Sequence, residues 1–206
     1  LLGLLLVAMS AYSFSFDRDT GAVRHLLIRR VSRPALVLAK LVYFHILALL
    51  AIVLLLAVCY FLSGSLWEFG PVVEDGFELI GEDEIRAEIS LGLRLALLPL
   101  PAAIALGVLV SVLANSATAA VTGALGITLA MDLFKGMLGD GANYLYARFQ
   151  PSLLDQSYLQ DVGRLVRGYS DVLVDERLLQ LNAWAPWPAL ALFTALAVAI
   201  VHMRKL

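Results

Sequence analysis

One uncharged run of amino acids limits what this chain can fold into more than any other feature. The run from Leu41 to Leu62, LVYFHILALLAIVLLLAVCYFL, contains no Asp, Glu, Lys or Arg. A helix needs about 20 mainly apolar residues to cross the hydrocarbon core of a bilayer, which is roughly 30 Å thick. The whole chain of 206 residues is 61% hydrophobic and 16% charged, against about 45–50% and about 25% in ordinary soluble domains. A soluble fold of this size could not hide so much apolar surface, so we predict an all-α, polytopic helical membrane protein.

Further apolar segments repeat this pattern along the chain. Region 89–138 is too long for one span, and its central LANSAT sequence favours a turn, because Asn and Ser bond locally to the backbone. Trp184 and Trp187 precede the last apolar segment, as interfacial tryptophans do. The chain opens inside an apolar segment without a Met, which we interpret as a truncated first helix. We predict one transmembrane domain over 1–206, with spans at about 1–15, 41–62, 91–113, 117–138 and 184–203. The external loops are predicted at 63–90 and 139–183. We expect the first loop to be solvated and the second to contain surface helices within 151–181.

The distribution of charge predicts which ends of these spans face the cytoplasm. Segment 16–40 carries six basic residues, and Arg204 and Lys205 follow the last span. Loop 63–90 carries eight acidic residues against Arg86 alone. Because cytoplasmic loops are enriched in Lys and Arg, we predict that segment 16–40, the NSAT turn and the C-terminus are cytoplasmic. Five spans place these three elements on one side, in agreement with the charges.

Segment 16–33 has the pattern of a short helix that lies along the membrane surface. Asp19 or Thr20 is a candidate N-cap, and Pro34 biases Arg33 away from the helical region, which leaves Ser32 free to cap the next span. Such a helix either binds anionic lipid and fixes the topology or docks onto a cytoplasmic partner, and charge does not separate these interpretations. Its apolar residues recur at helical spacing: Val23, Leu26, Leu27 and Val31.

The sequence contains no motif for chemistry of its own. A G-x-x-x-x-G-K-[ST] motif is absent, so the chain cannot supply a P-loop for nucleotide. Its three histidines are scattered without an H-E-x-x-H motif, and Cys59 is the only cysteine, which excludes an intrachain disulfide. The net charge of −2 does not favour a nucleic-acid partner. We expect no catalytic residue, metal or cofactor in this chain, and we expect that it is not an enzyme.

Ionisable residues within the spans are candidates for function, because charge is costly in hydrocarbon. Asp132 and Lys135 are three residues apart, so they can share a helix face and pair, at a position predicted to be near the outer mouth of the bundle. His45 is interpreted as an interfacial or helix-bonded histidine. Small residues in the fourth span predict close helix packing: Ala120, Thr122, Gly123, Ala124 and Gly126.

The order of motifs from residue 14 to residue 40 resembles that of a known transporter family. The pattern F-D-R-D-T-G-A-V-R-H-L-L, then V-S-R-P-x-x-x-x-x-K, resembles the permease subunit of type-2, exporter-like ABC transporters. The run from Leu95 to Ala130, with Ser111 before the turn, resembles the paired fourth and fifth spans of that family. One position departs from it, because Arg30 stands where the family often has Pro. The matching residues of the first pattern are Asp17, Arg18, Asp19, Thr20, Gly21, Leu26, Leu27, Val31, Ser32, Arg33 and Lys40.

The resemblance implies a coupling helix between the second and third spans of the complete permease. Such a helix lies in a groove of a separate ATP-binding subunit, which holds ATP and Mg²⁺, and a second permease subunit completes a homo- or heterodimer in a bacterial or archaeal cytoplasmic membrane. Ser111, Asp132 and Lys135 are then candidates for the translocation path. The alternative is a non-transporting membrane scaffold with a lipid-binding basic helix. The residues that we expect to couple to the ATPase are Asp17, Arg18, Gly21, Val23, Arg24, Leu26, Leu27 and Arg33.

Overall fold

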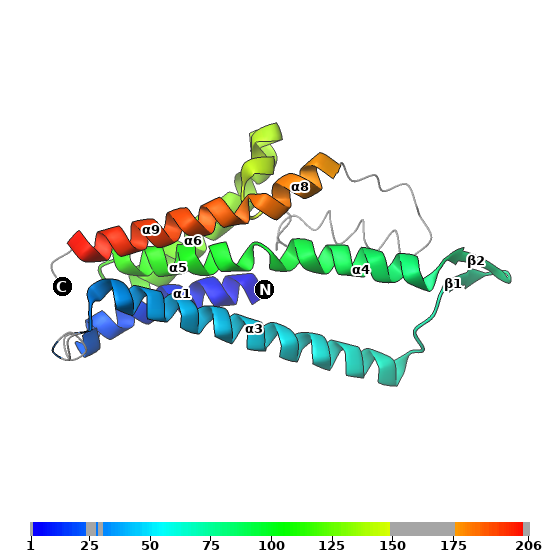
Figure 1. Ribbon diagram of the computed structural model, residues 1–206, viewed down its shortest axis with the longest axis horizontal. Helices are drawn as coiled ribbons and strands as arrows, with labels where there is room; N and C mark the ends of the chain where they lie inside the picture. Colours follow the sequence, from blue (N-terminus) through cyan, green and yellow to red (C-terminus); the bar gives the residue numbers. More distant parts are fainter. Residues whose placement is uncertain (1, 24–27, 29–30, 149–175, 204–206) are drawn as a thin grey trace.

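The computed structural model describes residues 2–23, 28, 31–148 and 176–203, and nearly all of them are helical (Figure 1). The all-α prediction is confirmed, with one small hairpin as the exception. The elements in chain order are α1 (Leu2–Asp19), α3 (Arg33–Leu66), β1 (Val72–Glu74), β2 (Phe77–Ile80), α4 (Glu82–Leu97), α5 (Leu100–Leu113), α6 (Ala117–Phe134), the 3₁₀ segment η1 (Lys135–Tyr144), α8 (Glu176–Trp184) and α9 (Pro186–Met203).

Helix α5 is the central helix of the bundle. Apart from Pro101, every residue from Leu100 to Val112 is buried. A helix that is apolar all round and buried all round needs neighbours on every side. Helices α1, α6, α9 and α3 supply these neighbours, and α1 makes the most extensive contact with α5. The core of the molecule is therefore the layer around α5.

Helices α1 and α5 approach each other closely where they cross at Gly107. A Cβ atom added at Gly107 would overlap the Ser10 hydroxyl and would lie 2.7 Å from the carbonyl oxygen of Val7. The Ser10 hydroxyl donates to that same Val7 carbonyl over 3.0 Å. Nearer the end of α1, the backbone N–H of Ser15 donates to the Ser111 hydroxyl over 2.9 Å. Only glycine allows the two backbones to lie this close.

Helix α3 contains the predicted span 41–62 but begins earlier than the span and extends beyond it. It packs on the bundle through one narrow stripe, and its apolar residues beyond Ala48 are largely exposed. The predicted cap is confirmed, because the Ser32 hydroxyl accepts the N–H of Ala35 over 3.3 Å. Arg33 is the first residue of the helix, so the predicted break falls one residue earlier, at Ser32. Pro34 is tolerated because the N–H groups of a first helical turn have no partner within the helix. The stripe consists of Val37, Leu41, Phe44 and Ala48.

The predicted span 91–113 is divided between two helices. Helix α4 ends at Leu97, and α5 starts at Leu100, with Pro99 as its N-cap and Pro101 in its first turn. Proline lacks an N–H, so Pro99 and Pro101 each remove a backbone hydrogen bond at this point, although Leu98 and Pro99 keep helical dihedral angles. Only α5 is buried in the bundle, whereas the polar first half of α4 extends away from it (Figure 1).

The first external loop contains more regular structure than the expected solvated loop. Strands β1 and β2 pair antiparallel, and the two residues between them, Asp75 and Gly76, have φ angles of 49° and 83°. A two-residue turn of this kind requires positive φ at both positions, which Asp-Gly provides. Three acidic residues then occupy the first turn of α4, where the helix dipole favours them: Glu82, Asp83 and Glu84.

The predicted turn between the paired spans is confirmed. Helix α5 ends at Leu113, and the Ser116 hydroxyl caps α6 by accepting the N–H of Ala119 over 3.2 Å. Ala120 and Ala124 are fully buried, as the small-residue pattern predicted. Gly126 instead faces open space.

Four helical segments among the described residues are long and apolar enough to cross a membrane. They correspond to the last four predicted spans. The first predicted span lies in α1, whose last three residues are all charged, and a fifth crossing there stays a prediction. The four segments are Arg33–Leu66, Glu82–Leu113, Ala117–Tyr144 and Gln180–Met203.

Candidate functional site at the charged end of the bundle

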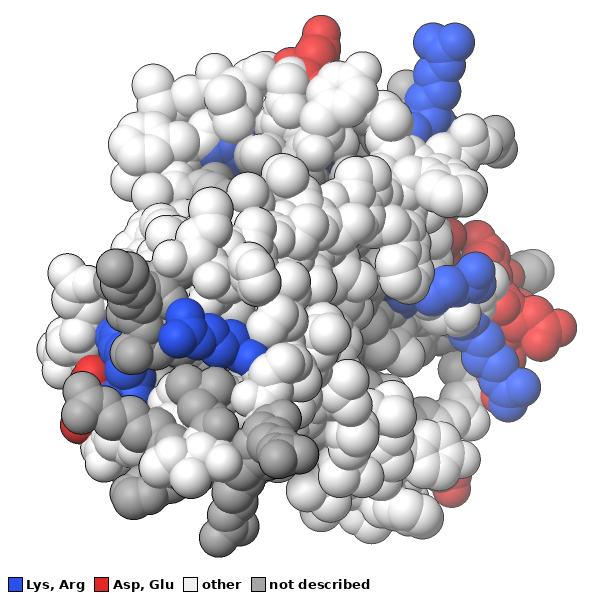
Figure 2. All heavy atoms as spheres, turned by 60° about the vertical axis from the view of Figure 1, so that its left-hand side comes forward, with Lys and Arg blue, Asp and Glu red and all other residues white. Residues whose placement is uncertain are grey.

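The end of α1, the start of α3, the α5–α6 turn and the end of α9 lie together at one end of the molecule (Figure 1). We call this the charged end, because it contains Asp17, Arg18, Asp19, Arg33 and Lys40. The face shown in Figure 2 is mostly uncharged, and its charged side chains gather in a few patches. The charged end therefore has the character expected of a membrane–water boundary, between apolar helices and a polar medium.

An ion pair joins the two helices that flank segment 20–32. Lys40 Nζ of α3 lies 2.6 Å from Asp17 Oδ2 of α1, and both side chains are about three-quarters buried. Partial burial reduces the screening by solvent, so this pair holds the two helices more firmly than a surface pair would. The sequence placed both residues in one motif but did not predict that they pair.

Asp19 connects the same end of α1 to α6. Its Oδ2 atom accepts the backbone N–H of Ala117 over 2.7 Å, and its Oδ1 atom lies 3.8 Å from Arg18 Nη2. The N-terminus of a helix has free N–H groups and a positive dipole, so a carboxylate there stabilises it. Asp19 was a candidate N-cap for a helix after residue 19. It caps α6 instead and is itself the last residue of α1.

Thr20 and Gly21 terminate α1, so neither Asp19 nor Thr20 is the cap predicted for the following short helix, although the described residues Ala22, Val23 and Ile28 are helical. The Thr20 hydroxyl donates to the Phe16 carbonyl over 2.9 Å, and Gly21 has φ of +79°. Residues with positive φ commonly follow the last helical residue, and glycine adopts this conformation without strain. Val23 is buried, and Ile28 is 79% exposed. Arg24, Leu26 and Leu27 lie outside the described residues, and nothing in the structure tests their predicted role.

The predicted pair of Asp132 and Lys135 is confirmed at the opposite end of α6. Lys135 Nζ lies 3.0 Å from Asp132 Oδ1, and the two side chains are 5% and 15% exposed. Both groups are thus withdrawn from solvent, and their predicted position near the outer mouth of the bundle stays a prediction. Ser111 is also fully buried, and its hydroxyl bonds to Ser15 of α1. Ser111 lies two residues before the end of α5, next to the α5–α6 turn, whereas Asp132 and Lys135 lie at the opposite end of α6.

Tyr146 is a buried polar residue that the sequence analysis did not single out. It is 4% exposed and packs edge-to-face on Phe193 of α9 with ring centroids 5.8 Å apart, and its hydroxyl has no hydrogen-bond partner among the residues that the structure describes. Burial raises the pKa of Tyr146 well above its usual range. Its position just after η1, between helices far apart in sequence, gives no local pattern that could have revealed it.

The described residues contain no group of three or more His, Cys, Asp or Glu side chains that could hold a metal ion. The charged end provides a mechanical connection between helices, because two carboxylates near the end of α1 contact α3 and α6 directly. The connection that enters from α1 and leaves into α3 is thereby attached to α1, α3 and α6.

Residues 1–202 match the sequence profile described as "ABC-2 family transporter protein". The chain belongs to the ABC-2 transporter family. Comparisons with curated proteins and with solved structures gave no match. Membership confirms the resemblance seen in the sequence and covers nearly the whole chain. The ABC-2 chain is therefore an integral membrane protein and a membrane permease of an ABC transporter, a class of subunit that works with a separate ATP-binding subunit.

We expect the Asp17–Lys40 pair of this ABC-2 chain to contribute measurable coupling between α1 and α3. In a double-mutant cycle of Asp17→Asn and Lys40→Met, the coupling free energy should be about 0.5–1 kcal/mol, because the pair is mostly buried. The measurement is the free energy of unfolding of each variant in mixed micelles. The Glu82–Arg86 pair has the same 2.6 Å separation but is far more exposed. It should show less coupling, and an equal value for both pairs would contradict the structural role of Asp17.

Proposed function

We propose that this chain is the permease of an ATP-driven transporter whose ATP and Mg²⁺ are bound by a separate subunit at the charged end. The observation that carries the proposal is the attachment of segment 20–32. Asp17 pairs with Lys40, and Asp19 caps α6, so the ends of this segment are connected to α1, α3 and α6. A force applied to the segment would be transmitted to three membrane helices at once.

Segment 20–32 acts as the coupling element in this proposal, because residues 16–19 of the predicted helix 16–33 belong to α1 and Arg33 begins α3. Its apolar residues Leu26 and Leu27 supply the area buried against the ATPase, whereas Val23 is already buried within this chain. Arg18, Arg24 and Arg33 set register and partner choice. Closure of the ATPase subunits on ATP moves this segment, and the bundle rocks around α5. A second permease subunit completes the path, and the charged end faces the cytoplasm of a bacterium or archaeon. Asp132, Lys135 and Ser111 stay candidates for the path.

The test places charge on the proposed docking ridge. In the double variant Leu26→Asp, Leu27→Asp, we expect the retained ATPase subunit to fall by at least about tenfold, because a carboxylate buried in an apolar contact costs more than about 1.4 kcal/mol. Membrane insertion should not change. The measurement is the ratio of ATPase to permease after affinity purification of the full-length protein from its native membranes.

A matched control lies at the other end of the molecule. Phe77 of β2 is 75% exposed, so Phe77→Asp adds a charge to an apolar surface residue far from the charged end. The ATPase ratio should be unchanged in this variant. An equal ratio of ATPase to permease in the Leu26/Leu27 variant and in the control would contradict the assignment of this segment as a coupling helix. A lipid-binding topology element, as in a scaffold protein, would then account better for the basic segment.

A further inference from the structure

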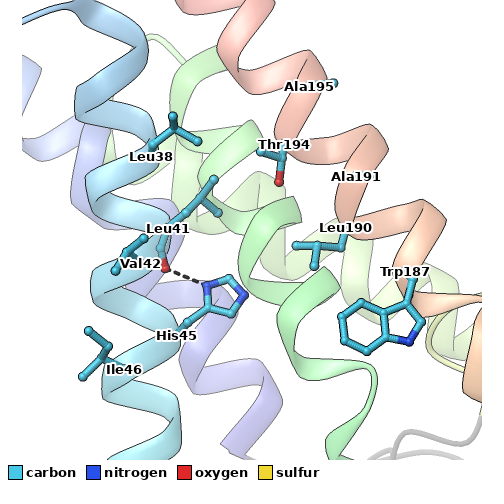
Figure 3. Close-up of a pocket in the computed structure, with 10 residues that line it drawn as sticks. All are labelled: Leu38, Leu41, Val42, His45, Ile46, Trp187, Leu190, Ala191, Thr194 and Ala195. Carbon is cyan, nitrogen blue, oxygen red and sulfur yellow. Dashed lines mark hydrogen bonds between the residues drawn. The ribbon is translucent and has the colours of Figure 1, made fainter.

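An apolar groove runs between α3 and α9 on the outside of the bundle (Figure 3). Its volume is about 680 Å³, which lies within the roughly 300–1,000 Å³ typical of ligand sites. Apolar side chains form almost all of its walls. The principal wall residues are Leu38, Leu41 and Ile46 from α3, and Trp187, Leu190 and Ala191 from α9.

The groove lies within the membrane-spanning parts of both helices. Leu38 is five residues beyond Arg33, and Ile46 is eight residues further, so the groove begins about 7–8 Å from the charged end and is about 12 Å long. On α9, Ala195 and Trp187 lie eight and sixteen residues before Met203, so there the groove extends over about 12–24 Å from the charged end. It therefore begins in the half of the bilayer that adjoins the charged end and reaches past the middle of a hydrocarbon core about 30 Å thick.

The rim of the groove is open toward this hydrocarbon. Val42, Ile46 and Trp187 are each more than half exposed. The exposed face of α3 continues the same apolar surface through Leu49 and Leu50. An apolar groove that opens onto lipid tails is filled by a lipid tail at little cost, because such tails are as apolar as leucine.

The groove contains few polar atoms, and the principal ones belong to His45 and Thr194. His45 Nδ1 lies 2.6 Å from the Leu41 carbonyl oxygen, so Nδ1 donates and, in the neutral ring, Nε2 is left as an acceptor. Figure 3 shows this second nitrogen directed toward α9, and the Thr194 hydroxyl on the opposite wall. Phospholipid ester groups are themselves acceptors, so His45 Nε2 offers them no bond. The apolar walls determine what binds.

We propose that the α3–α9 groove binds one acyl chain of an anionic phospholipid from the leaflet at the charged end. Charge supports this choice of lipid, because segment 16–40 carries six basic and two acidic residues at the same end. The chain lies along α3 and α9, and the headgroup lies at the level of the basic segment. A single acyl chain placed here fills the space that separates the two helices.

The test uses the full-length protein in vesicles of phosphatidylethanolamine and phosphatidylglycerol. A small fraction of the phosphatidylglycerol carries a diazirine near the end of one acyl chain, and the labelled peptides are identified by mass spectrometry after irradiation. Residues 38–46 and 187–195 should be labelled more strongly than residues 49–56 of α3, which are apolar and exposed but outside the groove.

Three variants decide between possible occupants. Ala191→Trp should lower the groove label by about fivefold, because an indole ring fills much of the space. Leu192→Trp should leave it unchanged, because Leu192 is exposed on the same helix outside the groove. His45→Phe should also leave it unchanged.

Equal labelling of the Ala191→Trp variant and the wild type would overturn the proposal and indicate that protein, such as a second copy of the chain, covers the groove. Loss of label in His45→Phe would also overturn it, in favour of a ligand held by a hydrogen bond.

Discussion

Replacing Gly107 with Ala is expected to destabilise the folded chain by about 1–3 kcal/mol, the usual cost of overpacking a well-packed core. The added Cβ would overlap the Ser10 hydroxyl and lie 2.7 Å from the Val7 carbonyl oxygen, so α1 and α5 must separate. Because α5 is the central helix, this separation disturbs the whole bundle. The measurement is the free energy of unfolding in mixed micelles.

The matched control is the same substitution at Gly126 of α6. No atom lies within 4 Å of a Cβ built there, so Gly126→Ala should be neutral, or stabilising by up to about 1 kcal/mol through helix propensity. Adding Ser10→Ala to Gly107→Ala should recover part of the loss, because it removes the nearest atom but not the Val7 carbonyl. Equal stability of the two alanine variants would contradict the close crossing of α1 and α5.

Replacing Lys135 with Met is expected to cost about 3–5 kcal/mol, because the Asp132 carboxylate would stay buried without the ammonium group beside it. Both side chains are at least 85% buried, and their charged atoms are 3.0 Å apart. The measurement is again unfolding in mixed micelles, with a double-mutant cycle that adds Asp132→Asn. The double variant should be more stable than the sum of the single losses predicts, by more than about 1 kcal/mol.

An exposed pair provides the reference for this cycle. Arg86 and Glu82 lie 2.6 Å apart on α4, with side chains 72% and 46% exposed, so Arg86→Met should change stability by no more than about 1 kcal/mol. Strict additivity at Asp132 and Lys135, or a Lys135→Met variant as stable as Arg86→Met, would show that the buried pair does not stabilise the fold.

Local signals in the sequence predicted much of this fold. The turn before α6 and the Ser32 cap could be predicted because each depends on a few neighbouring residues, whose side chains bond to the backbone nearby. The division of the span at Pro99 and Pro101, and the hairpin at Asp75-Gly76, also depended on local residues. Hydropathy alone does not predict the division of the span or the hairpin, because both depend on proline and turn chemistry.

The contacts that organise the candidate site could not be predicted in the same way. The bond from Asp19 to Ala117 connects residues 98 positions apart, and Ser15 and Ser111 are 96 apart. No periodicity in one segment reveals which partner from another segment it will meet. Asp17 and Lys40 both belong to the pattern that resembles the transporter family. Their physical role, an ion pair between α1 and α3, is visible only in the structure.

The most direct test of the proposed coupling is the composition of the complex in its native membrane. The full-length protein is purified by affinity in mild detergent, its partners are identified by mass spectrometry, and ATP hydrolysis is measured on the same sample. The account predicts a P-loop ATPase in fixed stoichiometry, with hydrolysis that disappears when Leu26 and Leu27 are replaced by Asp. A permease recovered without any ATPase in several detergents, and without ATP hydrolysis, would contradict it.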